Sequence, residues 1–529
     1  MLSESMHKKT NCEWVEEREE GREERGEEEK DGTEVEWRES YEGEDGRREA
    51  ARSFVEYYLA VNRCPIWLDS STAEEVKKLE ERIGQEEVFE KTGSTPQRRF
   101  SALQVAKVMK DDPNMREKVG CVSLVSSFIA SILLGKVAPI DISDGSGMNI
   151  LDIRTGEWDA EIGHALGIDT AIFGRPALSS CVLGNISAQF RRRYKVSASC
   201  KIVAATGDNP SSLAGLLSAV NDGDWAGGRG GHDRSSVCSG GDIEGSDEQE
   251  YSSSSSRMGR EGGSEERVFI SMGTSDTIFG QMSKLPGRQA CTTSAHVFFN
   301  PNSTTAKYED GATYMGLVCL SNGSLLREHL REELSDALAR KGGQEALSWR
   351  DFGEVVMKEM EAKQEGGSAK LDKCILRLDA VETDSQLAKL GVGEWRIGAH
   401  IDMEKQERSA EYVLHVLIGQ FLLLRRQAEN IGLFSPSSGL VTVVGGAAQN
   451  EALLQLLANV FDRPIARLVQ KDGASQSVNA AALGAAVRSA SVLTGRRAYA
   501  SGLISKVVCY PNMQIASQLF KDFNSIIAQ

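Results

Sequence analysis

The sequence predicts an α/β protein that contains two domains. At 529 residues the chain is too long for one ordinary hydrophobic core. Short apolar runs alternate along it with segments of helical periodicity, which is the pattern of mixed α/β folds. A hydrophobic fraction of 40% with a charged fraction of 26% is typical of globular proteins rather than fibrous or membrane ones.

Apolar runs bounded by Gly, Asn or Asp predict the strands, and leucines at helical spacing predict the helices. Strands are expected at 200–205, 267–273, 314–320 and 440–446, and helices at 409–431 and 450–461. The longest apolar stretch, 121–137, is interrupted by serines and falls short of the roughly 20 residues that span a membrane. It predicts a buried helix.

Two segments have compositions that cannot bury a core, and both are expected to be disordered. The first, 1–59, is Glu-rich: residues 1–50 hold 17 Glu and 2 Asp against 9 Lys or Arg, and so carry most of the net charge of −16. The second, 224–266, is a Gly- and Ser-rich insertion. It contains His232, Asp233 and Cys238, which could bind a metal ion in principle. No second cluster of possible ligands accompanies them, so a metal site is not expected there.

These segments set the expected domain boundaries. The first domain is expected at 60–223 and the second at 267–490, with a C-terminal extension at 491–529 that packs on the domains. Each domain would then hold its own share of the predicted strands and helices.

Charge and cysteine usage exclude several functional classes. Outside the acidic tail there is no excess of positive charge, so nucleic-acid binding is not expected. The 10 cysteines form no CxxC pair, which argues against a disulfide framework and a zinc site and favours reduced thiols in the cytoplasm. No apolar h-region follows Met1, so neither a secretory signal nor a membrane partner is expected.

Three glycine-containing turns follow predicted strands, at Thr206–Asp208, Met272–Asp276 and Val444–Ala447. None of them is a Walker-type loop. Backbone N–H groups at such corners form anion-binding nests, and the hydroxyls of Thr274 and Ser275 add donors. One such turn would be explained by the steric freedom of glycine alone, but three of them favour a polyphosphate ligand.

The first turn places a single carboxylate directly before a helix. Asn209 is a good N-cap and Pro210 a good first helical residue, so the helix is expected to start directly after Asp208. Asp208 would lie at the carboxyl end of a strand, where ligands bind in open α/β sheets. It could there take the proton of a hydroxyl that attacks a phosphoryl group. The spacing also allows an aspartate that only complements the helix dipole.

The motifs together resemble the FGGY carbohydrate kinases, and within them the eukaryotic xylulokinase type. The resemblance covers about residues 60–490 apart from 224–266 and follows the family order. It is carried by PIWLDSSTAEEVKKLE (65–80), SLVSSFIASILLGKVAPIDISDGSGMNILDI (123–153), CKIVAATGDNPSSLAG (200–215), VFISMGTSDTIF (268–279), HVFFNPN (296–302), YMGLVCLSNGSLLRE (314–328) and GGAAQNEALLQLLANVFDRPI (445–465). It implies two actin–hexokinase-like (ribonuclease H-like) α/β domains with a ligand cleft between them.

The resemblance implies transfer of phosphate from ATP, with Mg²⁺ on the polyphosphate, to D-xylulose. Asp208 matches the catalytic base of the family. Positions that match sugar contacts are Arg99, Asp208 and Asn209; positions that match nucleotide contacts are Gly273, Thr274, Trp349, Gly445, Gly446 and Asn450. The match around Trp349 is weaker, and a surface tryptophan is the alternative there.

Other positions shape the expected site without an assigned step or depart from the family. The stretches Trp67–Asp69 and Asp144–Gly147 are expected on the sugar side, and Ile418 stands where the family usually has Glu. The family also opens with a strand and turn that carry Asp, Ser or Thr, and Gln, and it has a later Gln-His-Gly. Neither occurs here, so the first domain is expected to be truncated. The sequence is then either incomplete or that of a paralog that has lost catalysis.

Two alternative functions stay open from the sequence. One is another sugar or polyol kinase of the same family. The other is a catalytically impaired protein that binds a nucleotide or a sugar.

Overall fold

The structure is a computed structural model that describes residues 2–3, 59–61, 63–219, 267–282, 284–290, 294–342, 346–366, 370–378, 393–398, 408–433, 439–470, 479–500 and 503–527. The expected acidic tail lies almost wholly outside these residues. The expected insertion, with His232, Asp233 and Cys238, lies wholly outside them.

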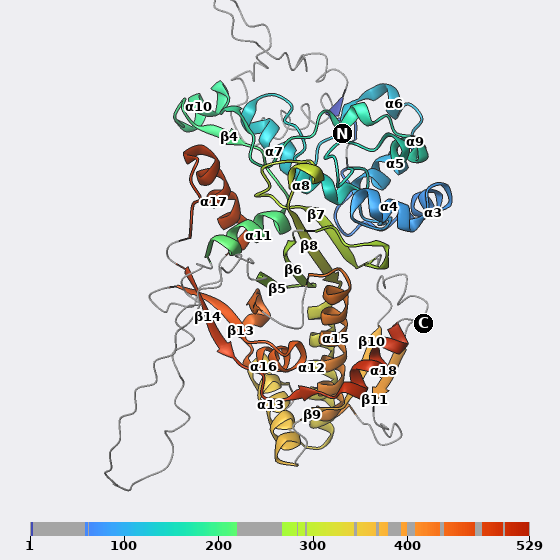
Figure 1. Cartoon of the computed structure of the whole chain (residues 1–529), viewed down its shortest axis with the longest axis vertical. Coiled ribbons are helices and arrows are strands. Elements are labelled where there is room, and N and C mark those ends of the chain that lie inside the picture. Colours follow the sequence, from blue (N-terminus) through green and yellow to red (C-terminus); the bar gives the residue numbers. More distant parts are fainter. Residues whose placement is uncertain are drawn as a thin grey trace, which may run out of the picture.

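The N-terminal region, residues 59–219, is mostly helical (Figure 1). Its elements are α3 (Ala73–Arg82), α4 (Gln85–Thr92), α5 (Ser101–Asp111), α6 (Met115–Lys118), β2 (Val119–Cys121), α7 (Val125–Leu134), α8 (Ile142–Gly145), η1 (Ser146–Met148), α9 (Ala160–Leu166), η2 (Thr170–Phe173), β3 (Val182–Asn185), α10 (Ala188–Tyr194), β4 (Lys201–Val203) and α11 (Asp208–Ala219). Its described strands form two antiparallel ladders, β3 with β4 and β2 with the short β1 (Leu2–Ser3).

The C-terminal region, residues 267–527, alternates strands and helices. Its elements are β5 (Arg267–Met272), β6 (Asp276–Met282), η4 (Arg288–Ala290), β7 (Ala295–Phe299), η5 (Tyr308–Asp310), β8 (Tyr314–Leu320), α12 (Gly323–Arg340), α13 (Trp349–Glu365), β9 (Lys370–Leu371), β10 (Lys373–Leu378), β11 (Gly393–Gly398), α15 (Ala410–Asn430), β12 (Leu440–Val444), η6 (Gly446–Gln449), α16 (Glu451–Phe461), β13 (Ile465–Gln470), α17 (Ala480–Thr494), β14 (Leu503–Cys509), β15 (Gln514–Ile515) and α18 (Ser517–Ile527). The predicted strands at 267–273, 314–320 and 440–446 and both predicted helices are confirmed.

A seven-stranded sheet organises the C-terminal region, with the strand order β14-β13-β12-β5-β6-β8-β7. β12 runs parallel to both β5 and β13, and the remaining neighbours are antiparallel. The parallel strands therefore lie in the middle of the sheet, where helices cover both faces. β14 forms one edge of this sheet, and α18 buries Leu519, Phe523 and Ile527 in the core of the same region.

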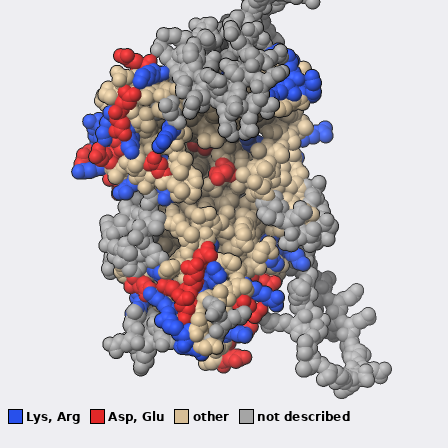
Figure 2. All heavy atoms as spheres, turned by 180° about the vertical axis from the view of Figure 1, so that it is seen from behind, with Lys and Arg blue, Asp and Glu red and all other residues tan. Residues whose placement is uncertain are grey.

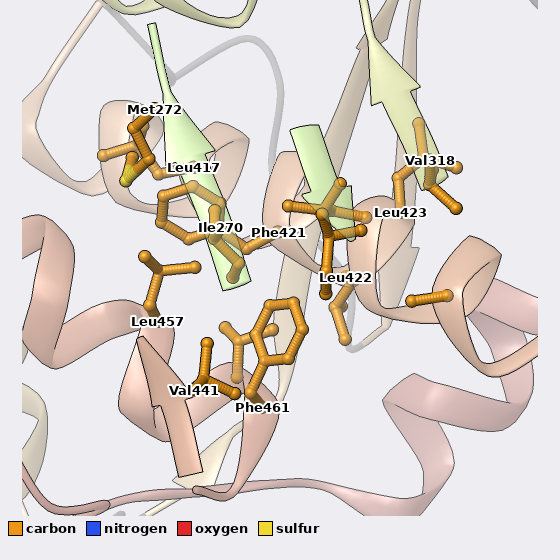
Figure 3. Packing of buried hydrophobic residues seen from close by; sticks show 14 of the residues in the cluster. Ile270, Met272, Val318, Leu417, Phe421, Leu422, Leu423, Val441, Leu457 and Phe461 are labelled. Carbon is orange, nitrogen blue, oxygen red and sulfur yellow. The ribbon is translucent and has the colours of Figure 1, made fainter. Parts of the chain in front are cut away.

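The alternation of side chains along β5 divides the core between the two faces of the sheet. Ile270 and Met272 pack with Phe421 of α15 and Leu457 of α16 in the larger cluster (Figure 3). Phe269 points to the other face, where it packs with leucines of α11 in a second cluster. The helix that follows Asp208 thus lies on the sheet of the C-terminal region, between the two regions (Figure 1).

The prediction of a buried helix over 121–137 is wrong in extent and in burial. The helix is α7, Val125–Leu134, and it buries Ala130 and Leu134 against the β3–β4 ladder. Its other face is open, with Val125 76% and Ile129 50% exposed. The sequence misled because this helix has apolar residues all round, whereas only one face has packing neighbours that bury it.

The two regions meet along β7 and at a crossing of two helices. Near β7, the backbone N–H of Val297 donates to the carbonyl of Gly93 (2.8 Å), and that of Phe299 donates to Ser146 Oγ (3.1 Å).

Seen from behind, charged side chains gather toward the two ends of the molecule, and the middle of that face is mostly uncharged (Figure 2).

At the crossing, α11 and α17 pack backbone to backbone. A Cβ built at Gly484 would lie 1.6 Å from the carbonyl oxygen of Ser211, and one at Gly215 would lie 2.4 Å from that of Ala480. No side chain fits at either position, so both helices need glycine at the crossing. The result is that the first two turns of α11 are fixed by a helix of the C-terminal region.

Candidate active site

The turn after β4 exposes one carboxylate at the start of a helix. Asp208 is the first residue of α11, and its side chain is exposed. Its Oδ1 accepts hydrogen bonds from the backbone N–H (2.7 Å) and the Nδ2 (3.2 Å) of Asn209. The expectation that Asn209 caps the helix is wrong, because the Gly207 carbonyl already accepts the helical bond from Ser211 (3.0 Å). The Asn209 amide orients the carboxylate instead.

A second carboxyl group lies directly behind this turn. A Cβ built at Gly207 would be 2.7 Å from Oδ1 of Asp144, so glycine is what lets the two segments approach. Asp144 also accepts a hydrogen bond from the Ser126 hydroxyl at the start of α7. Burial, with the negative charges of Asp141 and Asp208 adding to it, raises the pKa of Asp144 to about 7. Near neutral pH this carboxyl therefore exists in both protonation states.

A buried arginine of the C-terminal region supports the same turn. Arg488 of α17 donates to the carbonyl of Ala204, at the end of β4 (2.7 Å), and to that of Ser179. Burial raises the pKa of Asp141, and the positive charge of Arg488 acts to lower it. The Asp141 carboxylate accepts a hydrogen bond from the backbone N–H of Asp144 (3.0 Å). The base of the turn that carries Asp208 is thus held by a side chain from across the molecule.

Arg99 faces the C-terminal sheet from the N-terminal region. Its guanidinium lies 5.7 Å from the ring centroid of Trp67, within the range of cation–π contact. Burial lowers the pKa of Arg99, and Cys319 of β8 is near enough to act on it in the opposite direction. Ser275, in the turn between β5 and β6, hydrogen-bonds the same thiol and opposes the burial that raises its pKa. Arg99 and the second glycine turn therefore share a neighbour.

The turn between β5 and β6 spans Gly273–Ser275, and Gly273 and Thr274 are exposed. A Cβ built at Gly273 would meet nothing within 4 Å, so there is open space in front of this residue. The Gly273 N–H donates within the turn to the Ser275 carbonyl (3.2 Å). Thr274 is thus the exposed residue of the turn that carries a hydroxyl group.

The third glycine turn lies beside the second. β12 pairs with β5 in parallel, so both turns stand at the carboxyl ends of neighbouring strands. Gly445 has φ +96°, and a Cβ there would lie 2.6 Å from the Met272 carbonyl oxygen, so this position requires glycine. Gly446 is exposed with nothing within 4 Å of its Cβ position. The structure therefore brings Gly273, Thr274, Gly445 and Gly446 to one end of the sheet.

Asn450 and Trp349 are joined to each other near that end. Asn450 caps α16 by accepting from the Leu453 N–H (3.2 Å), and its Nδ2 donates to the Trp349 carbonyl (3.1 Å). Trp349 is 43% exposed and lies in edge contact with Phe352, with the Arg331 guanidinium 5.2 Å from its ring centroid. The two residues therefore form one unit at the start of α13 and α16.

Two other residues that the sequence singled out are Ile418 and Asp69. Ile418 is 1% exposed in the core of the C-terminal region, where a Glu would be an unpaired buried charge. The Asp69 carboxylate accepts hydrogen bonds from the backbone N–H (2.9 Å) and the hydroxyl of Ser71, which lower its pKa. Asp69 lies two residues from Trp67, whose ring the Arg99 guanidinium approaches.

Sequence reasoning missed the residues that hold the turns in place. Arg488 went unnoticed although it is the one charged residue in the apolar run AALGAAVRSA, four residues after Gly484. That spacing puts both residues on one face of a helix, which is the signal that could have found it. Asp276, Arg327 and Gln420, described below, also went unnoticed, because they lie in three separate elements.

Within the described residues, no group of three or more His, Cys, Asp or Glu could hold a metal ion. Among those residues there is also no helix with the length and apolar character needed to cross a membrane.

Comparison with known proteins places the chain in a family. Residues 59–215 match the FGGY family of carbohydrate kinases, N-terminal domain, and residues 268–492 match its C-terminal domain. The chain is 31% identical to the xylulose kinase of Rattus norvegicus over 411 residues, which is 77% of this chain and 62% of that protein. The chain thus spans about three fifths of the length of this relative.

Solved structures of sugar kinases share the fold. The gluconate kinase from Lactobacillus acidophilus matches 87% of this chain and 77% of its own with a TM-score of 0.59 at 15% identity. The ligand-bound xylulose kinase from the same organism matches the same shares with a TM-score of 0.58 at 15% identity. The predicted two-domain, actin–hexokinase-like fold is confirmed by these likenesses together with the two family matches. The chain belongs to the FGGY family of carbohydrate kinases.

Proposed function

We propose that this chain is a carbohydrate kinase that transfers the γ-phosphoryl group of ATP to a hydroxyl group of D-xylulose. The observation that carries the proposal is the placement of Asp208. Its exposed carboxylate begins a helix that packs on the same sheet whose strand ends carry two open glycine turns. A proton acceptor and two candidate phosphate-binding turns are thus built on one framework.

In the proposed reaction Asp208 takes the proton of the sugar hydroxyl while the hydroxyl oxygen attacks the γ-phosphorus. The oxygen–phosphorus bond to the sugar forms as the bond to ADP breaks. The two hydrogen bonds from Asn209 keep the Asp208 carboxylate oriented for this transfer. Asn209 and Arg99, whose guanidinium lies near Cys319 of β8, are proposed to bind the sugar.

The nucleotide is proposed to lie along the end of β5 and β12. The open space in front of Gly273 and Gly446 lets phosphate groups approach the backbone closely, and the exposed Thr274 can donate its hydroxyl. Asn450 and Trp349 lie where the adenosine end would extend. Mg²⁺, as used by kinases generally, would neutralise charge on the polyphosphate. The described residues contain no group of three or more His, Cys, Asp or Glu that could hold a metal, and we assign no residue to it.

Similarity to the rat xylulose kinase supports D-xylulose as the acceptor. The alternatives are another sugar or polyol acceptor and a protein that binds a nucleotide or sugar without transfer. A single experiment separates them: γ-³²P-labelled ATP is incubated with purified protein and D-xylulose, gluconate or glycerol, and labelled sugar phosphates are resolved by chromatography. Label on D-xylulose alone is the expected result. Label on gluconate or glycerol instead would change the acceptor, and ATP binding without label on any sugar would contradict the kinase proposal.

A further inference from the structure

A buried ion pair lies directly beneath the turn between β5 and β6. Asp276, the first residue of β6, is 0% exposed, and Arg327 of α12 is 1% exposed. The guanidinium forms a two-pronged contact, with Nη1 donating to Asp276 Oδ2 (2.6 Å) and Nη2 donating to Oδ1 (2.9 Å). This fork fixes the relative orientation of the two side chains as well as their distance.

A third element joins the pair. Gln420 of α15 donates its Nε2 to Asp276 Oδ2 (2.7 Å) and, at 3.4 Å, to the carbonyl of Gly323. Gly323 is the first residue of α12, and a Cβ there would lie 2.3 Å from Asp276 Oδ2. The carboxylate of Asp276 is therefore enclosed by the start of α12, its fifth residue and a side chain of α15.

The same helix start holds the turn itself. Both the backbone N–H (3.2 Å) and the hydroxyl (3.1 Å) of Ser324 donate to the carbonyl of Thr274. With its carbonyl engaged by α12, Thr274 keeps its hydroxyl side chain exposed. Any shift of Asp276 relative to α12 would be passed to Thr274, because only Ser275 separates Thr274 from Asp276 in sequence.

An apolar cluster could make this junction equally stable, because removing two charges from water costs much of what their attraction returns. An apolar cluster would not fix the angle between the turn and the helix, because hydrophobic contact has no direction. We propose that Asp276, Arg327 and Gln420 are positioning residues for the phosphate groups of the nucleotide. They hold the Gly273–Ser275 turn in the geometry that presents Thr274. This inference rests on the proposed binding of ATP at that turn.

The experiment compares two variants with a matched control. Gln420→Leu removes one hydrogen bond from Asp276 and leaves the ion pair complete, and Arg327→Lys keeps the charge but loses the fork. Gln427→Leu is the control: Gln427 lies two turns further along α15, is 0% exposed, and its side-chain amide makes no hydrogen bond within the described residues. Calorimetry measures the affinity of each protein for ATP and for adenosine, which lacks phosphate.

Gln420→Leu is expected to weaken ATP binding by about threefold to tenfold, as loss of one charge-assisted hydrogen bond would. Arg327→Lys is expected to weaken it further. Adenosine affinity should stay unchanged in both, and Gln427→Leu should match the unaltered protein for both ligands. Equal losses of ATP and adenosine affinity, or no loss in either variant, would overturn the inference alone. Failure of the unaltered protein to bind ATP would overturn the proposed function as well.

Discussion

The two regions of the molecule support their candidate site residues in different ways. In the C-terminal region, the glycine turns stand on a seven-stranded sheet with a core on both faces. In the N-terminal region, the turn of Asp208 follows the two-stranded β3–β4 ladder, and the helix beside it, α7, leaves Val125 76% exposed. What fixes Asp208 comes largely from the C-terminal region, through Arg488 and the Gly215–Gly484 crossing. The comparison teaches that the two glycine turns are supported within their own region, whereas the position of Asp208 depends on contacts between the two regions.

The largest effect should appear in the activity of the chain as it stands. Phosphoryl transfer depends on positioning, and the exposed apolar face of α7 leaves the N-terminal side less well supported than the two glycine turns of the C-terminal region. Residues 1–529 are expected to bind ATP but to turn over D-xylulose at least ~10³-fold more slowly than the rat xylulose kinase assayed beside them. Several turnovers per second would show that the N-terminal region is sufficient as described.

The next largest effect should follow removal of the proposed base. Asp208→Asn keeps the shape of the side chain but cannot take a proton, so kcat should fall by at least ~10²-fold while ATP affinity stays unchanged. Asp310→Asn, in the exposed η5 turn, is the matched control. It should leave kcat within twofold of the unaltered value, which is a change of less than about 0.5 kcal/mol in the activation free energy. A variant at position 208 that transfers labelled phosphate as fast as this control would refute the role of Asp208.

Arg488→Met tests most directly whether the turn of Asp208 and the two glycine turns of the C-terminal region are supported independently. It would leave the carbonyls of Ala204 and Ser179 and the carboxylate of Asp141 without their charged partner, which should lower the free energy of unfolding by about 3 kcal/mol. We expect kcat to fall about tenfold with unchanged ATP affinity, because Arg488 donates to the carbonyls of Ala204 and Ser179, which lie outside the two glycine turns of the C-terminal region.

Urea unfolding measures the free energy of unfolding, the labelled-phosphate assay measures kcat, and calorimetry measures the affinity for ATP. Arg496→Met at an exposed position serves as control. A loss of ATP affinity comparable to the loss of kcat would mean that the two regions are not supported separately.

The smallest effect concerns the pH dependence that Asp144 introduces. Its pKa is raised from 3.8 to about 7 in the folded chain, so the folded state favours the protonated carboxyl. The stability that Asp144 contributes is complete below pH 3.8 and is lost as the pH rises to about 7. Asn resembles the protonated form at every pH. Relative to Asp144→Asn, the unaltered protein should therefore lose about 1–3 kcal/mol of unfolding free energy between about pH 4 and pH 7. A difference that stays constant across this range would contradict the raised pKa.

The sequence predicted the elements whose pattern is local. β5, β8, β12, α15 and α16 begin and end within a few residues of expectation, because their apolar periodicity and flanking glycines are visible in one short window. The family resemblance matched the turns at Gly273 and Gly445 to contacts with one nucleotide, and the parallel pairing of β5 and β12 puts the two turns side by side.

What could not be predicted depends on contacts between distant segments. The exposure of Val125 and Ile129 depends on which neighbours α7 has, and nothing in its own sequence reports them. Asp276 and Gln420 are 144 residues apart, and Arg488 is 284 residues from the carbonyl that it contacts. A single sequence carries no record of such pairs, so the residues that position the turns became visible only in three dimensions.

The Gly215–Gly484 crossing fixes the direction in which each face of α11 points. Asp208 and Gly215 are seven residues apart in one helix, so they lie within about 20° of the same face. Inserting or deleting one residue between Asn209 and Gly215 would turn Asp208 and Asn209 together by about 100° relative to the crossing, and so away from Asp144. A change of length there would move the carboxylate without replacing it. We therefore expect the seven-residue spacing between Asp208 and the crossing to matter more than the identity of the residues that fill it.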